Sequence, residues 1–132
     1  MPPAPRPARR SSRSARTACR CFTSATCRCG RAPRPVIEKN FPNSFRGTNL
    51  DQQLKDLNVK NLVVAGMMTH MCVDATVRHA ADLGYKVTLL ADACATRAQS
   101  FGGENVPARQ VHAAFLAALN GFYAKVVKSD EL

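Results

Sequence analysis

The chain has 132 residues and a formal net charge of +10, and its first 35 residues hold nine Arg, no Lys and no acid. Residues 36–132 are nearly neutral, with ten basic and nine acidic residues. The length excludes more than one ordinary domain, and no apolar run is long enough to cross a membrane. The Arg-rich start lacks the apolar core of a secretory signal, so we expect a cytoplasmic protein without a membrane partner.

Residues 1–34 form a basic tail that is rich in Arg, Pro, Ala and Ser and has Phe22 as its only aromatic residue. So little of it is apolar that we expect it to be disordered on its own. An organelle transit peptide and an arm that binds nucleic-acid phosphates are alternatives, but the lack of lysines and interleaved aromatics disfavours nucleic acid. Four cysteines of the tail, Cys19, Cys21, Cys27 and Cys29, are spaced C-x-C-x5-C-x-C, unlike the C-x2–4-C pairs of zinc sites. A metal site or a disulfide knot is therefore the weaker alternative, and we predict no metal and no cofactor.

Apolar spacing in residues 36–132 predicts alternating strands and helices. Val36 and Ile37 end a short apolar stretch, which we expect to be a strand, and residues 40–47 are a loop. A helix follows over 48–57, with Thr48 as its cap and Asp51 completing a short capping box. Residues 61–65, NLVVA, are a buried strand.

The second half of the chain continues the alternation. A helix begins near Met71 or Cys72 and ends at Gly84, and residues 86–91 are the next buried strand. Residues 92–106 are a long loop, a third helix runs from Pro107 to Gly121, and residues 123–127 are a last short strand. The apolar faces of the two helices are Val73, Val77, Ala80 and Ala81, and Val111, Phe115 and Leu119.

This order predicts an α/β fold with a parallel sheet and helices on its faces. Ligands of such sheets bind at the carboxyl ends of the strands. Lys39, the segment Gly66–Cys72 and Asp92 each follow a predicted strand, so we expect them at one rim of the sheet.

Cys72 lies on a predicted strand-to-helix turn, where a thiol becomes a nucleophile. Backbone N–H groups at the start of a helix stabilise a thiolate and can also hold a developing oxyanion. The alternative is a buried structural thiol. Cys94, in the predicted loop after the next strand, is expected to be inert.

Several motifs fall in the order of a known family: Lys39, Ser44–Phe45, Thr48, the G-x-x-T-x-x-C-V box at Gly66–Val73, Thr76, Gly84–Tyr85 and Asp92–Ala93. Residues 35–131 thereby resemble the isochorismatase-like cysteine hydrolases, which include nicotinamidases, carbamoylsarcosine amidohydrolases and streptothricin hydrolase. The resemblance implies a three-layer α/β/α fold with a mostly parallel sheet. It also implies cleavage of an amide or related C–N bond of a small molecule.

The resemblance assigns roles to individual residues. Cys72 is the nucleophile, and Lys39 is the nearby cation that favours its thiolate. The backbone N–H groups of Met68 and Cys72 hold the oxyanion, and a cis peptide joins Met67 to Met68. The reaction forms a thioester, releases an amine and ends with hydrolysis by water.

Apolar and aromatic residues around this site are expected to line its pocket. They are Phe41, Phe45, His70 and Met71, although either phenylalanine could belong to the core and His70 could contact a partner or the pocket rim. Relatives commonly associate through helices near this site, so a homo-oligomer is a further expectation.

One departure from the family pattern concerns its general base. The family's catalytic Asp lies on a first strand, and nothing in residues 1–34 resembles that strand or contains an acid. We therefore expect residues 35–132 to be a partial domain with impaired activity, or a non-catalytic remnant. Residues 18–31, back-translated and read in a shifted frame, allow LPVFHIRHVSVR, which resembles the family's second strand; we hypothesise that residues 1–34 are a wrong-frame translation.

Overall fold

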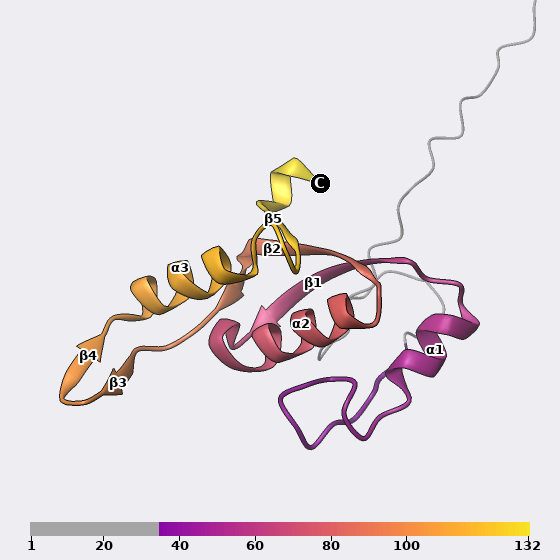
Figure 1. Ribbon diagram of the computed structural model, residues 1–132, viewed down its shortest axis with the longest axis horizontal. Coiled ribbons are helices and arrows are strands. Elements are labelled where there is room, and N and C mark those ends of the chain that lie inside the picture. Colours follow the sequence, from indigo (N-terminus) through magenta and orange to yellow (C-terminus); the bar gives the residue numbers. More distant parts are fainter. Residues whose placement is uncertain (1–34) are drawn as a thin grey trace, which may run out of the picture.

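Three parallel strands form the sheet of the computed structural model, which describes residues 35–132 (Figure 1). They are β1 (Asn61–Met67), β2 (Lys86–Ala95) and β5 (Lys125–Val127), in the order β1-β2-β5. The expected parallel α/β architecture is thus confirmed. Our predictions for the tail, including its cysteines, its disorder and its reading frame, lie outside the described residues.

Strand β2 is four residues longer than its apolar run indicated. It pairs with β1 from Asn61↔Lys86 to Val64↔Leu89, and after a register shift the pairing resumes at Gly66↔Cys94. Gly66 has φ +137°, which a residue with a side chain rarely adopts, and this conformation accompanies the irregularity. Asp92 therefore lies within a strand, and the expected loop over 92–106 is wrong at its start.

The remainder of that expected loop contains a hairpin. Strands β3 (Gln99–Phe101) and β4 (Glu104–Val106) pair antiparallel around Gly102 and Gly103. Both glycines have positive φ, +60° and +86°, as a two-residue hairpin turn requires. A Gly-Gly pair between short segments is the sequence signal for such a hairpin, and the expectation of a continuous loop overlooked it.

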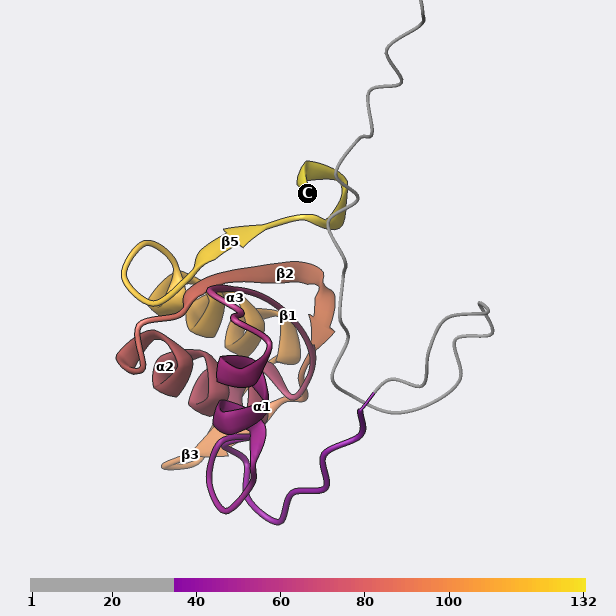
Figure 2. The same ribbon diagram turned by 90° about the vertical axis from the view of Figure 1, so that its right-hand side faces the viewer.

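Three α-helices pack with the sheet: α1 (Leu50–Asp56), α2 (Asp74–Asp82) and α3 (Ala108–Leu119). Helices α2 and α3 contact each other and lie on the same side of the sheet (Figure 2). A short 3-10 turn, η2 (Ser129–Glu131), follows β5. No helix in residues 35–132 combines the length and apolarity that crossing a membrane requires.

The first predicted strand and the first predicted cap differ from the structure. Residues 35–39 have no regular structure, although Ile37 packs against the core. Helix α1 begins at Leu50 rather than Thr48, and the Thr48 hydroxyl accepts a hydrogen bond from the Leu50 N–H at 3.3 Å. Asp51 does not complete a capping box, because its carboxylate binds two other side chains.

The core lies between the sheet and the helices. Leu89 of β2, Val77 of α2 and Leu119 of α3 are fully buried, as the helical and strand periodicities predicted. Ala81 and Phe115, expected on the same apolar faces, are only half-buried. The other apolar residues of this cluster are Phe45, Leu50, Leu54, Val73, Ala80, Tyr85, Val87 and Ala124.

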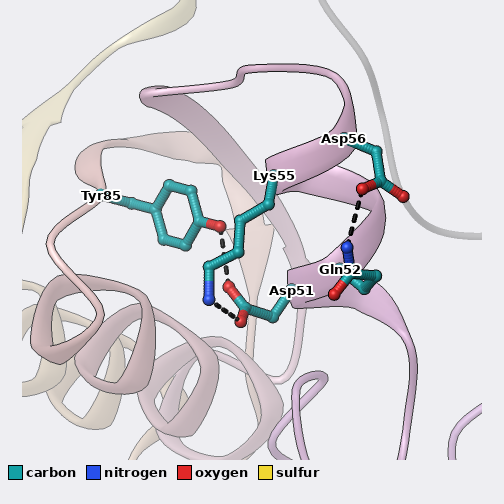
Figure 3. A network of polar contacts seen from close by, with 5 residues as sticks. All are labelled: Asp51, Gln52, Lys55, Asp56 and Tyr85. Carbon is teal, nitrogen blue, oxygen red and sulfur yellow. Dashed lines mark hydrogen bonds and ion pairs between the residues drawn. The ribbon is translucent and has the colours of Figure 1, made fainter.

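Asp51 connects α1 to the start of β2 (Figure 3). Its carboxylate accepts hydrogen bonds from the Lys55 ammonium at 2.5 Å and from the Tyr85 hydroxyl at 2.8 Å. These bonds, the Lys55 one foremost, lower the pKa of Asp51. Burial, and next the bond to Asp51, raise the pKa of Tyr85 to about 12.

This environment predicts an unusual alkaline titration. The pKa of Tyr85 is higher in the folded state than in the unfolded chain, where a tyrosine has a pKa of about 10. The stability contributed by neutral Tyr85 is therefore complete below about pH 10 and is lost as the pH rises toward 12. Of the chain's two tyrosines, Tyr85 should give a phenolate absorbance step near pH 12. Tyr85→Phe should remove this step; its persistence in that variant would contradict the assignment.

Candidate active site

The turn that carries Cys72 follows β1 almost directly. Thr69–Val73 form a π-helical turn, η1, which leads into α2 at Asp74. The Met68 carbonyl accepts hydrogen bonds from Met71 N–H at 3.0 Å and from Val73 N–H at 3.2 Å. The second bond spans five residues, which is the π-helical pattern and is common at functional sites. The helical path thus begins two or three residues earlier than the sequence indicated.

The peptide bond between Met67 and Met68 is cis, the geometry that the family resemblance implied. Cys72 itself is half-buried on the turn. Two methionines beside it are open to solvent, with Met67 71% and Met71 40% exposed. Their side chains therefore offer exposed apolar surface on the segment that carries the thiol.

Lys39 lies in the segment before α1 and contacts its own loop. Its ammonium donates hydrogen bonds to the carbonyls of Phe41 at 3.0 Å and Pro42 at 3.2 Å. An ammonium has three N–H donors, so these two bonds leave one for another acceptor. In residues 35–132, no hydrogen bond joins Lys39 to Cys72, so any effect of Lys39 on the thiol acts through its charge.

Thr76 anchors this loop to the helix that follows the Cys72 turn. Its hydroxyl accepts the backbone N–H of Ser44 at 3.1 Å and lies 3.1 Å from the Ser44 hydroxyl. Thr76 is four residues after Cys72, one helical turn further along the chain. The loop that bears Lys39 is therefore fixed to the same structural unit as Cys72.

The two phenylalanines expected to line the pocket have different environments. Phe41 is 40% exposed, and the guanidinium of Arg46 lies 3.9 Å from its ring centroid. Phe45 is only 8% exposed and packs against the rings of His79 and Tyr85. Of the two alternatives for Phe45, pocket lining or core, its burial agrees with the core, where a large apolar ring gains free energy by leaving water.

His70 connects the Cys72 turn to two other elements. Its Nδ1 hydrogen-bonds to the hydroxyl of Thr96, just after β2, and its ring meets Phe115 of α3 edge-on at 6.0 Å between centroids. The preceding residue, Thr69, is hydrogen-bonded to His112 of α3 at 2.9 Å. Sequence reasoning missed this role of His112, because no local pattern links residues 43 positions apart.

The carboxylate expected at the rim is engaged elsewhere. Asp92 accepts hydrogen bonds from the backbone N–H and the hydroxyl of Ser129, and the hydroxyl bond is the main reason that the pKa of Asp92 is lowered. In the described part of the chain, no carboxylate contacts Cys72 or Lys39. The same residues contain no cluster of histidine, cysteine and acidic side chains suited to a metal ion.

Cys94 provides a contrasting thiol in the same sheet. It is half-buried on β2 opposite Gly66. Burial, and to a lesser extent the negative charge of Asp92, raise the pKa of the Cys94 thiol. Cys94 therefore serves as the internal reference thiol for Cys72.

Known proteins are similar to this chain in sequence, and solved structures are similar to it in fold. YddQ of Bacillus subtilis, an uncharacterized isochorismatase family protein, is 54% identical over 72% of this chain and 53% of its own length. Nicotinamidase 3 of Arabidopsis thaliana is 34% identical over 76% of this chain and 46% of its own length. The crystal structure of an isochorismatase from Pseudomonas putida has a TM-score of 0.72 and 41% identity, covering 74% of this chain and 50% of that one.

The matched region includes nearly all of the described residues. The chain spans about half the length of the curated relatives it matches. The family model of the isochorismatase domain covers residues 29–131, from the end of the tail to the last residue but one. On this match, together with the shared fold, the chain belongs to the isochorismatase family.

Proposed function

We propose that this chain carries the site of a cysteine hydrolase that cleaves an amide or related C–N bond of a small molecule. The observation that carries the proposal is the position of Cys72 on a helical turn that starts almost directly after β1. Such turns present backbone N–H groups to a thiolate and to an oxyanion. Nicotinamidase 3, a relative of the chain, is named for the hydrolysis of an amide.

The proposed reaction has two covalent steps. The Cys72 sulfur attacks the amide carbonyl carbon, the oxyanion is held by the N–H groups of Met68 and Cys72, and the C–N bond breaks. The amine leaves with a proton, and a thioester remains on Cys72. Water then attacks the thioester and releases the acid and the thiol.

The supporting groups have separate roles in this scheme. Lys39 favours the thiolate through its positive charge, from the loop that Thr76 anchors. Met67, Met71 and Phe41 supply exposed apolar surface for the non-reacting part of the substrate. Because no carboxylate contacts Cys72 in residues 35–132, a proton acceptor is lacking there, and we expect slow turnover.

Thiol reactivity tests the proposal without requiring turnover. Iodoacetamide should alkylate Cys72 at least about tenfold faster than Cys94 at neutral pH, because burial raises the pKa of the Cys94 thiol, whereas a helical turn and a cation favour a reactive thiolate. Peptide mapping by mass spectrometry resolves the two sites from the four tail cysteines. Equal rates at Cys72 and Cys94 would refute an activated site and favour a non-catalytic member of the family.

Hydrolysis is measured in parallel with nicotinamide as the probe and ammonia release as the readout. Any turnover should disappear in Cys72→Ser and survive in Cys94→Ser. A rate that is unaffected by Cys72→Ser would exclude Cys72 as the nucleophile, whatever its reactivity toward iodoacetamide.

A further inference from the structure

We infer that His112 is a positioning residue for the Cys72 turn, and that it acts through the buried hydroxyl of Thr69. The inference rests on the proposed function for its chemical meaning, because it concerns how the reactive thiol is held. The contacts themselves join three elements: the turn η1, the carboxyl end of β2, and helix α3.

The Thr69 side chain is the centre of this arrangement. It is the only fully buried polar side chain in the described part of the chain, with no solvent exposure. Burying a hydroxyl is costly unless it is hydrogen-bonded. The Thr69 hydroxyl lies 3.2 Å from the Ala95 carbonyl and 2.9 Å from His112 Nδ1. Thr69 is the first residue of η1, so these bonds hold the turn at the point where it leaves β1.

His112 extends the connection to a second point on β2. Its Nε2 lies 3.2 Å from the Ala91 carbonyl, which can only accept a hydrogen bond, so Nε2 carries a proton. In a neutral ring, Nδ1 is then an acceptor, so the single hydroxyl proton of Thr69 is shared between Nδ1 and the Ala95 carbonyl. One imidazole thus joins α3 to β2 on one side and to the Cys72 turn on the other.

A parallel bridge holds the next residue of the turn. His70 hydrogen-bonds to Thr96 and packs edge-on against Phe115. Phe115 is three residues after His112, on the same face of α3, and Thr96 directly follows Ala95. Consecutive residues of the turn are therefore held between the same two elements, which leaves the path of the chain toward Cys72 little freedom.

A purely structural histidine would have the same contacts, so the test needs a readout that stability alone does not move. The ratio of the alkylation rates of Cys72 and Cys94 is such a readout. General loosening of the fold exposes both thiols and raises the rate at each. Loss of positioning lowers the rate at Cys72 and leaves Cys94 unchanged.

The variants separate the two ends of the bridge in the full-length protein. Thr69→Val removes the hydroxyl at constant shape, and Thr69→Ser retains it. His112→Asn keeps a polar atom near the Nδ1 position, facing Thr69, whereas His112→Gln places one near the Nε2 position, facing Ala91. Thr88→Val, on β2, is the matched control, because its hydroxyl has no hydrogen-bond partner among the described residues.

We expect Thr69→Val and His112→Gln to lower the Cys72-to-Cys94 ratio with iodoacetamide by about fivefold, the effect of losing one ordinary hydrogen bond. Thr69→Ser, His112→Asn and Thr88→Val should stay within about twofold of the unmodified chain. If Cys72 reacts faster than Cys94 in the unmodified chain and Thr69→Val does not lower that ratio, the positioning role is overturned and the proposed function stays intact. A parallel rise at both cysteines in that variant would overturn it as well.

Amide hydrogen exchange tests the bridge even if Cys72 in the unmodified chain reacts no faster than Cys94, the outcome that refutes the proposed function itself. The N–H groups of Met71 and Val73 are bonded to the Met68 carbonyl, and the N–H of Leu83 is bonded within α2. Thr69→Val should accelerate exchange at Met71 and Val73 relative to Leu83. Equal protection in both proteins would show that Thr69 and His112 do not hold the turn.

Discussion

Leu89→Ala should lower the free energy of unfolding by about 3 kcal/mol, the typical cost of removing a fully buried leucine side chain. Leu89 has no solvent exposure and lies in the central strand of the sheet, where it belongs to the same apolar cluster as Val77 and Leu119. The cost has two parts: the lost transfer of apolar atoms out of water, and the cavity that the packed neighbours cannot fill.

Urea unfolding followed by circular dichroism measures this effect. Leu83→Ala is the matched control, because Leu83 is 42% exposed at the end of α2 and should cost less than about 1 kcal/mol. The slope of the unfolding free energy against urea concentration should be the same for each variant and the unmodified chain, since they expose nearly the same surface on unfolding. Similar losses in the two variants would show that β2 does not form the centre of the core.

Lys39→Met should slow the alkylation of Cys72 by about tenfold at neutral pH, because a neighbouring cation favours the thiolate by this factor or more. Two of the three N–H donors of Lys39 are used by the carbonyls of its own loop. In the proposed site, the third N–H donor of Lys39 and its positive charge are available to the Cys72 thiolate. Lys39→Arg keeps the charge and should retain most of the reactivity.

The control for this experiment is Lys60→Met, which removes an equal charge just before β1, at the opposite end of that strand from Cys72. It should change the rate less than about twofold, since exposed charges at that distance are screened by salt. Cys94 reports on the fold in both variants and should react as before. Identical rates for Lys39→Met and Lys60→Met would remove Lys39 from the proposed site.

Much of the fold was predictable because its elements are amphipathic in a regular way. The apolar runs of β1 and β2 and the 3.6-residue spacing of Val73, Val77 and Ala80 predict the parallel sheet and its covering helix. Gly84 has φ +85° and ends α2 as expected. These features were predictable because each depends on residues that are close together in the sequence.

The features that the sequence did not reveal depend on contacts between residues that are distant in the sequence. Strand β2 continues past Asp92 because β1 keeps pairing with it beyond the irregularity at Gly66, although Asp92 is polar. Phe45 belongs to the core because Tyr85 and His79 come to meet it from other elements. The roles of Thr69 and His112 were hidden for the same reason, since only the folded chain brings them together.

The contacts of Thr69 also bear on the order of events during synthesis, because they join residues that are far apart in the sequence. The residues that hold the turn lie 26 and 43 positions further along the chain, at Ala95 and His112. A polypeptide that emerges from the ribosome amino end first therefore exposes Cys72 well before it contains these partners. If the proposed positioning holds, Cys72 gains its held position only after α3 has been synthesised, and until then the nascent chain carries this thiol in an unassembled turn.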